Sequence, residues 1–398
     1  MNPRQHTQTP GHAGRLSHIT AARQAVLLEG RSMAVQLGEA VDPWIERSWQ
    51  RCLAQGRRPD ESLGFDAVSR EAMQRAVEAS RPLVNAARPI LGQLAHAMAH
   101  TRYFAILTNA QGIVVEASGP IDRKDRRAIN ITRIGVDLSE RAVGTTAIGA
   151  ALGERQPVWL HRGEHFFDAN TPYSCAGAPL FGPSGECVGM LDLTGIDAPE
   201  RPELKHLVTQ CAQRIENALL HQENFALLVR LSWPNDPLWA WGQGDINAPD
   251  PRTQARVSAN ESDGLICLDG DGYVVGSNTT ARQMLPMIAL EATTPAAHSP
   301  VHSSDLFAMP WENLFDAAML GQSALEVPLW SGLRLHAWPQ FAKTADAPPA
   351  PRRAAGQSLR DVETSLIRKA VAQANGNVTE AARALGISRA TVYRKLGH

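Results

Sequence analysis

The chain has 398 residues, more than one ordinary hydrophobic core accommodates, so its length predicts two or three domains. Apolar residues make up 43% and charged residues 20%, which excludes a chain that is disordered throughout. The formal net charge of -1 excludes a chain-wide attraction to nucleic acid or membrane, so any such affinity must come from a local patch.

The cysteines and the hydropathy of the chain indicate in which cellular compartment the protein is expected. The five cysteines are widely spaced and form no C-x-x-C pair, which predicts free thiols in a reducing compartment and no disulfide framework or zinc site. No apolar run approaches the roughly 18 residues of a membrane span, and the first residues lack the apolar stretch of a signal peptide. We therefore expect a cytoplasmic protein without a membrane partner, a metal or a cofactor.

The N-terminal part of the chain is predicted to be helical. Residues 1–20 are polar and suggest a disordered tail, and residues 21–80 form a helical region that contains "ITAARQAVLLEG" and "VDPWIERSWQRCLAQG". Pro43 suits a first helical turn and Gly56 a C-terminal cap. A further helical stretch runs from about residue 66 to 100, and its apolar stripe indicates packing or dimerisation.

Residues 81–225 combine strands and helices. The runs "FAILT" and "IVVEA" flank a four-residue turn with Gly112 and predict a β-hairpin, and further strands are expected at "PVWLH", "CAGAPLF" and "CVGMLDLTG". We expect one helix over "ERAVGTTAIGAALGE" and a long exit helix over "ELKHLVTQCAQRIENALLHQENFALLVR". The pattern predicts a twisted sheet flanked by helices, an α/β domain.

Residues 250–340 predict a second, smaller α/β domain. Its first half reads strand, Asp271-Gly272 turn, strand and short helix, and "ALEVPLW" and "LRLHAWPQ" supply further strands. Residues 341–357 are rich in proline and alanine and predict a linker.

Residues 358–398 predict a helix-turn-helix. Ser358 suits the N-cap of a first helix that ends near Gly376, a short helix runs from Thr379 to about Gly386, and Ser388 suits the N-cap of a third. Residues 352–398 hold nine Arg or Lys and three Asp or Glu, so their local net charge is +6.

The polar face of this segment predicts DNA binding. Cations and hydrogen-bonding side chains on an outward helix face suit phosphate oxygens and base edges in the major groove. The alternative is a solvated helical cap whose charge only keeps the chain end soluble. The candidate DNA-binding residues are Thr379, Ser388, Arg389, Thr391, Tyr393, Arg394 and Lys395.

These motifs resemble known families. From Gly376 to Leu396 the chain is similar to the Fis-type DNA-binding domain of bacterial enhancer-binding regulators, and the landmarks "IERSWQRCLAQG", "VDLSERAVGTTAIGAAL", "EHFF" and "SCAGAPLFGPSGECVGMLDLTG" resemble regulators of acetoin and glycerol catabolism. The resemblance implies a multidomain α+β chain: a GAF-type sensor at 81–225, a PAS-like domain at 250–340 and an all-α helix-turn-helix at 358–398.

The chain departs from this family at informative places. Leu138 stands where the family usually has Trp, and Thr146 where it usually has Asn, so the ligand of the relatives cannot be transferred. The resemblance also implies an ATPase domain between sensor and DNA-binding parts, whereas only the linker follows the second domain here. The sequence contains no Gly-Lys dipeptide, so it holds no P-loop and we expect no ATPase activity.

The first α/β domain offers candidate ligand and reactive residues. Aromatic and polar side chains that suit the wall of a small-molecule pocket are Trp159, His165, Phe166, Phe167 and Tyr173. The cluster His161, His165 and Asp168 allows a metal site or a catalytic base, although we favour hydrogen-bonding loop residues as its explanation. Cys175 allows a redox sensor or a nucleophile, but its small, apolar neighbours favour an inert buried thiol. Asp192 either orients a pocket or, as we prefer, satisfies a neighbouring backbone group.

Together these features indicate a transcriptional regulator and not an enzyme. We expect a homodimer that senses a small effector and binds a palindromic double-stranded DNA operator, with RNA polymerase or a related regulator as a further partner. The alternative is a sensor or scaffold protein that modulates a full-length ATPase-bearing relative by hetero-oligomerisation. An enzyme with a GAF regulatory domain has no segment left for a catalytic domain.

Overall fold

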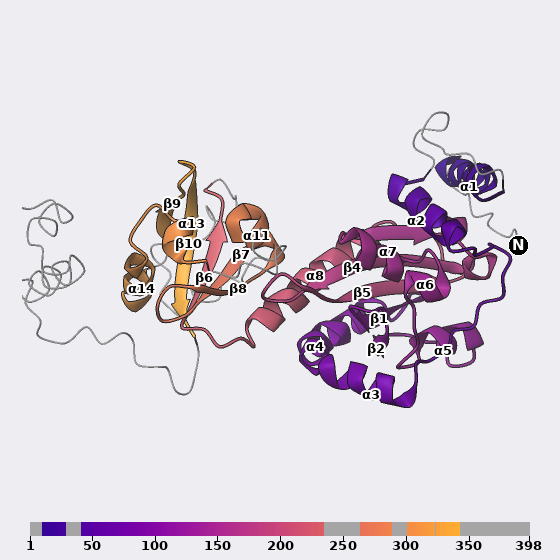
Figure 1. Cartoon of the computed structure of the whole chain (residues 1–398), viewed down its shortest axis with the longest axis horizontal. Helices are drawn as coiled ribbons and strands as arrows, with labels where there is room; N and C mark the ends of the chain where they lie inside the picture. The colour runs from indigo at the N-terminus through magenta and orange to yellow at the C-terminus, as the bar shows by residue number, and fades with distance from the viewer. Residues whose placement is uncertain (1–9, 29–40, 235–262, 289–300, 323, 343–398) are drawn as a thin grey trace, which may run out of the picture. The chain divides into compact units, whose positions relative to one another are not determined.

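The computed structural model describes residues 10–28, 41–234, 263–288, 301–322 and 324–342 (Figure 1). The chain divides into two compact units, residues 1–342 and residues 343–398, and all described residues belong to the first unit. The predicted helix-turn-helix and nearly all of the predicted linker therefore lie outside the described residues.

The first sheet has five antiparallel strands in the order β2-β1-β5-β4-β3. All five predicted strands are present, and β1 and β2 pair as the predicted hairpin, in which Gly112 has a φ of 82°. The strands are β1 Tyr103–Asn109, β2 Val114–Ser118, β3 Val158–His161, β4 Tyr173–Phe181 and β5 Cys187–Ile196.

Helices cover both faces of this sheet. Phe104 and Ile106 of β1 join the core that includes residues of α2 and α7, whereas Ala105 and Leu107 point to the opposite core, which includes residues of α4 and α8. Every residue of β1 is buried, which explains its continuous apolar run. The helices of this domain are α2 Pro43–Ala54, α3 Arg70–Ala79, α4 Arg81–Ala97, α5 Arg126–Thr132, α6 Glu140–Val143, α7 Ala147–Glu154 and α8 Leu204–Leu220.

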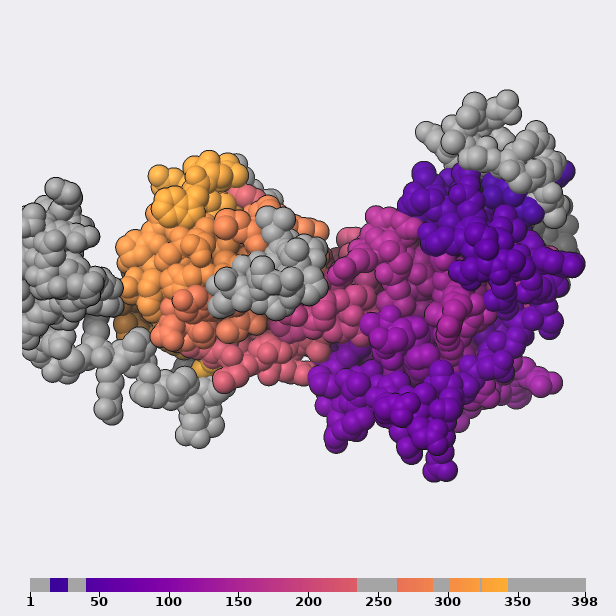
Figure 2. All heavy atoms as spheres, viewed as in Figure 1, coloured from indigo at the N-terminus to yellow at the C-terminus, as the bar shows by residue number. Residues whose placement is uncertain are grey.

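The N-terminal segment corrects the prediction of a tail. Residues 1–20 were predicted to be disordered, yet Pro10–Arg23 form helix α1, followed by a π-helical turn, η1 Gln24–Leu28. Ile19, Ala22 and Val26 are fully or almost fully buried, so apolar packing holds this segment. Figure 2 shows the indigo N-terminal residues against the magenta residues of the same unit.

Two predicted helices are interrupted. The stretch predicted as one helix over 140–154 divides into α6 and α7, because Gly144 takes a φ of 69° and Thr146 caps α7. The predicted exit helix ends at Leu220, and Leu227–Ser232 form strand β6 instead. In β6 the buried Leu227, Val229 and Leu231 alternate with less buried residues. This period of two is typical of a strand, and the prediction of a helix over these residues overlooked it.

The second sheet is also antiparallel, in the order β8-β7-β6-β10-β9. Because β6 is its central strand, this domain begins before the predicted boundary at residue 250, and whether it is PAS-like stays a prediction. Its elements are β6, β7 Gly264–Leu268, β8 Val274–Ser277, α11 Thr279–Met284, α13 Ser303–Leu306, α14 Glu312–Met319, β9 Leu325–Pro328 and β10 Arg334–Phe341.

Candidate functional site

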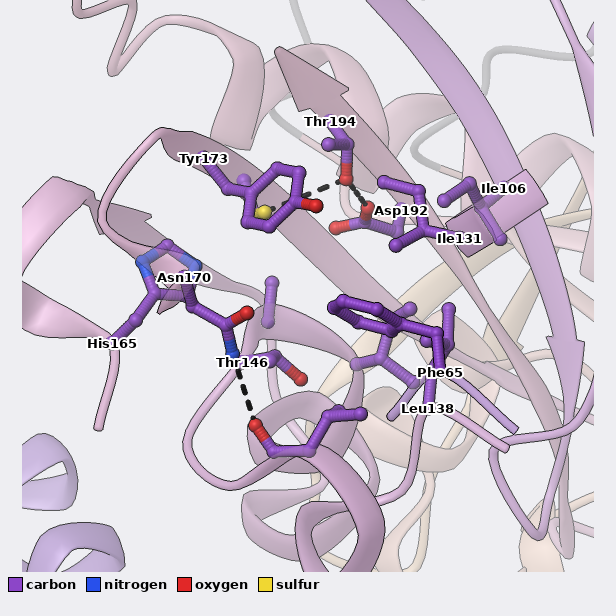
Figure 3. Close-up of a pocket in the computed structure, with 14 residues that line it drawn as sticks. Phe65, Ile106, Ile131, Leu138, Thr146, His165, Asn170, Tyr173, Asp192 and Thr194 are labelled. Atoms are coloured by element: carbon purple, nitrogen blue, oxygen red, sulfur yellow. Dashed lines mark hydrogen bonds between the residues drawn. The ribbon is translucent and has the colours of Figure 1, made fainter. Parts of the chain in front are cut away.

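A small cavity lies beside the first sheet (Figure 3). The space in this cavity that the centre of a water molecule can occupy is about 30 Å³. One water molecule needs about 10–15 Å³ of such space. The cavity therefore has room for a ligand of only a few heavy atoms. The lining residues are Phe65, Ile106, Ile131, Leu138, Val143, Thr146, Ala147, Ile148, His165, Asn170, Tyr173, Cys175, Asp192 and Thr194.

Strands β4 and β5 supply the polar side of the cavity. Cys175 pairs with Thr194 in the sheet register, and the alternation of side chains places Tyr173 and Asp192 on the same face. The Cys175 sulfur lies 3.4 Å from the Thr194 hydroxyl oxygen, and that hydroxyl donates a hydrogen bond to Oδ2 of Asp192. A chain of hydrogen bonds thus ends on the Asp192 carboxyl group.

Asp192 has an unusual environment for an acidic side chain. It is 1% exposed, its Oδ1 has no hydrogen-bond partner, and burial raises the pKa of its carboxyl group to about 7. The sequence interpretation that Asp192 satisfies a neighbouring backbone group is wrong, because its oxygens contact only the Thr194 side chain and the cavity. A buried carboxyl oxygen without a partner is costly, so a ligand that donates a hydrogen bond would be stabilised here.

The turn between α6 and α7 forms another wall. Gly144 ends α6 with a φ of 69°, and a Cβ atom at this position would lie 2.6 Å from the Phe167 ring. The Thr146 hydroxyl accepts a hydrogen bond from the Gly149 N–H at 3.3 Å and caps α7. The Asn170 side-chain amide donates to the Val143 carbonyl at 3.0 Å, and its own oxygen has no partner.

His165 lies at the edge of the cavity in the neutral form. Its Nδ1 is 2.8 Å from the carbonyl oxygen of Arg162, which can only accept, so Nδ1 carries the proton and Nε2 is an acceptor. Burial lowers the pKa of the imidazole to about 4. Nε2 is buried and has no partner.

The loop that carries His165 and Asn170 is held by the N-terminal helix. This loop contains η2 Arg162–Glu164 and η3 Asp168–Asn170. The Arg23 guanidinium donates to the carbonyls of Gly163 at 3.0 Å and Phe166 at 3.1 Å, to the His165 carbonyl, and to Asp168 at 2.6 Å. Arg15 and Trp49 add contacts to Glu164 at 2.7 and 2.9 Å.

The structure separates the five predicted pocket residues. His165 and Tyr173 line the cavity. Phe166 and Phe167 are completely buried and pack edge to face against each other, with ring centroids 4.9 Å apart, and Trp159 belongs to the core on the opposite face of the sheet. The sequence analysis did not identify Asn170 or the apolar wall, because these residues come from separate elements of the chain. It did single out Leu138 and Thr146 as departures from the family pattern, and both line the cavity.

The predicted reactive groups have ordinary structural contacts. Nδ1 of His161 lies 2.6 Å from the Ser174 hydroxyl, and Asp168 is paired with Arg23. Among the described residues, no three His, Cys, Asp or Glu side chains are grouped to hold a metal ion. Cys175 is buried, and burial raises the pKa of its thiol well above the usual range. The seven candidate DNA-binding residues, Thr379 to Lys395, lie outside the described residues.

Two family models match separate parts of the chain. Residues 20–217 match the N-terminal domain of MimR, and residues 358–397 match the family described as bacterial regulatory protein, Fis family. These matches confirm the resemblance to regulators with a Fis-type DNA-binding domain that was drawn from the sequence. The whole cavity falls within the MimR-type domain.

The curated relatives that the chain matches are themselves named as regulators of transcription. The acetoin catabolism regulatory protein of Cupriavidus necator is 29% identical over 248 residues, which cover 62% of this chain and 35% of the relative. The propane 2-monooxygenase operon transcriptional activator MimR of Mycolicibacterium goodii is 29% identical over 190 residues, covering 47% and 31%. The chain thus spans about a third of the length of these relatives.

One solved structure overlaps a large part of the chain. A chain of the Escherichia coli DhaR(N)-DhaL complex aligns with 75% of this chain and 99% of its own length, at 16% identity and a TM-score of 0.43. Within the part of the chain that the structure describes, no helix is both long and apolar enough to span a membrane.

Proposed function

We propose that this protein is a DNA-binding transcriptional regulator whose MimR-type domain binds a small effector in the cavity beside Asp192. The observation that carries the proposal is the pairing, in one chain, of a Fis-type segment with a domain whose cavity presents a buried, unpartnered carboxyl oxygen. Small-molecule sites typically combine apolar walls with a few polar groups, as this cavity does.

The DNA-binding part is proposed to act as a dimer. Residues 352–398 have a local net charge of +6, which supplies the sequence-independent attraction to phosphates that the whole chain lacks. One short recognition helix reads few bases, so two copies on a palindromic operator, with half-sites about 34 Å apart, would supply the remaining specificity. Effector binding would act by changing the relative placement of the two protomers.

The chain is proposed to act without ATP hydrolysis. Its sequence contains no Gly-Lys dipeptide and hence no P-loop, so it lacks the phosphate-binding loop of the common ATPases. Regulation would then depend on DNA occupancy or on contacts with RNA polymerase or another regulator.

Fluorescence anisotropy of the purified protein with its own upstream DNA tests this proposal. We expect tight binding that weakens as salt rises and that exceeds binding to an unrelated duplex of equal length. Equal, weak binding to both duplexes would contradict direct regulation. That outcome would favour the alternative, a sensor that acts by hetero-oligomerisation with a larger relative.

A further inference from the structure

The open polar atoms of the cavity are hydrogen-bond acceptors. Oδ1 of Asp192, Oδ1 of Asn170 and Nε2 of His165 are buried and have no partner. The Nδ1–H of His165 is already used by the Arg162 carbonyl, and one of the two side-chain N–H groups of Asn170 is used by the Val143 carbonyl. The hydroxyls of Tyr173 and Thr146 can donate or accept, so they do not change this balance. A ligand that fits must therefore supply donors.

The charge of the cavity lining points in the same direction. Asp192 is the one acidic residue among the lining residues, which include no Lys or Arg, and His165 is neutral near pH 7. An anion such as a carboxylate or phosphate would face a carboxyl group and two further open acceptors without any cation. Both the charge and the hydrogen-bonding groups of the lining therefore disfavour an anionic metabolite.

We propose that the cavity binds a small primary amine in its ammonium form, with the ammonium group on Asp192. This inference rests on the proposed function, because it takes the cavity to be the effector site. An ammonium group has three N–H donors and no acceptor, which matches the chemistry of the open atoms, and it provides the counter-charge that a buried carboxylate needs. A neutral hydroxyl donates only one hydrogen bond and leaves the carboxylate without a counter-charge.

The cavity also sets the size of the amine. Its volume of about 30 Å³ admits a ligand of only a few heavy atoms. The apolar walls suit a short alkyl chain and come from Phe65, Ile106, Ile131 and Leu138. Such a small ligand has a limited total binding energy, so its Kd is expected in the millimolar range.

Binding of an ammonium ion should compete with protonation of Asp192. The titratable groups around this carboxyl are Cys175 and Tyr173 on β4, whose pKa values are raised by burial, and His165, whose pKa is lowered to about 4. The lining residues from β1, α5, α6 and α7 have no titratable side chain. Between about pH 6 and about pH 8, Asp192 is thus the lining group that changes charge, while an alkylamine stays protonated.

Isothermal titration calorimetry with three probes of matched size tests this proposal: ethylamine, ethanol and acetate. With a carboxyl pKa of about 7, we expect ethylamine to bind about tenfold more tightly at about pH 8 than at about pH 6. Acetate should not bind, and ethanol should bind more weakly than ethylamine at about pH 8. The Asp192→Asn variant should lose ethylamine binding, whereas Glu216→Gln, which removes another buried carboxyl group outside the cavity, should keep it.

Other outcomes would overturn the proposal. Ethanol binding as tightly as ethylamine, ethylamine affinity that does not change with pH, or no saturable ethylamine binding would each exclude the amine. If Asp192→Asn does not fold, the pH dependence of the wild-type protein decides alone. Because calorimetry needs no DNA, amine binding without operator binding would refute only the proposed regulator, and operator binding without amine binding would refute only this inference.

Discussion

The Thr194 hydroxyl donates to one carboxyl oxygen of Asp192 and leaves the other oxygen facing a small cavity without a partner. This arrangement follows from the alternation of side chains along β5, which puts both residues on one face, and the pairing of β5 with β4 places Cys175 beside Thr194. The buried carboxyl group makes specific predictions for stability as a function of pH.

The stability of the ligand-free protein should contain a contribution from Asp192 that disappears as pH rises. Its pKa is raised from 3.8 to about 7, so this contribution is fully present below about pH 4 and is lost as pH rises through about 7. Relative to the Asp192→Asn variant, the wild-type free energy of unfolding should fall over that interval by a few kcal/mol, about 4 at most. Urea unfolding of both proteins across this pH range measures the difference, and a constant difference would contradict the raised pKa.

His165 should have the opposite effect. Because burial lowers the pKa of its imidazole from 6.5 to about 4, its contribution to stability is present above about pH 6.5 and is lost as pH falls toward 4. We expect His165→Asn, which can keep a donor toward the Arg162 carbonyl, to lose stability less steeply in acid than the wild type. His206→Asn, at an exposed position, is the control and should behave as the wild type does. Parallel acid profiles for all three proteins would argue against a buried neutral imidazole.

Removal of the Arg23 side chain should loosen the loop beside the cavity. Arg23→Ala leaves the carbonyls of Gly163, His165 and Phe166 without this donor, so we expect a loss of about 1–3 kcal/mol of unfolding free energy. Arg58→Ala, which removes an exposed ion pair with Asp60, should cost clearly less than Arg23→Ala because solvent screens that pair. Chemical denaturation compares the two variants, and equal costs would show that Arg23 does not hold the loop.

Two glycine substitutions should have opposite effects. Gly144→Ala forces a Cβ into a backbone with a φ of 69° and to within 2.6 Å of the Phe167 ring, so it should destabilise the protein by more than about 1 kcal/mol. Gly153→Ala lies inside helix α7 with no atom within 4 Å of its new Cβ, and it should stabilise by about 0.5–1 kcal/mol. Thermal unfolding measures both. A neutral Gly144→Ala would mean that the α6–α7 turn is not needed in this conformation.

Two arginines of the Fis-type segment should matter for DNA binding. Arg389→Ala and Arg394→Ala should each weaken operator binding by about 1–3 kcal/mol if the side chain contacts guanine. If it contacts phosphate instead, binding should weaken similarly on all sequences and the salt dependence should become less steep. Arg58→Ala, in the N-terminal domain, is the matched control in the same anisotropy measurement. Unchanged operator affinity in both arginine variants would refute docking through this helix.

All five strands of the first sheet could be predicted because their apolar runs are short and bounded by turn residues. The predictions failed where a backbone conformation or a neighbouring strand decided the outcome. Gly144 interrupts the predicted helix over 140–154 because its left-handed φ turns the chain before Thr146 caps the next helix. Residues 227–232 form a strand because β7 and β10 flank them in the sheet, which their sequence neighbours do not show.

The sequence alone carried the resemblance to regulators with a Fis-type domain, because the pattern from Gly376 to Leu396 and the landmarks of the first domain are local in the chain. It also marked Leu138 and Thr146 as departures from the family. Only the tertiary structure decided that both line one cavity, together with Asp192, His165 and others from separate elements. The physical reason is that a buried site gathers side chains far apart in sequence, and the burial that raises the pKa of Asp192 exists only after the sheet and its helices have packed.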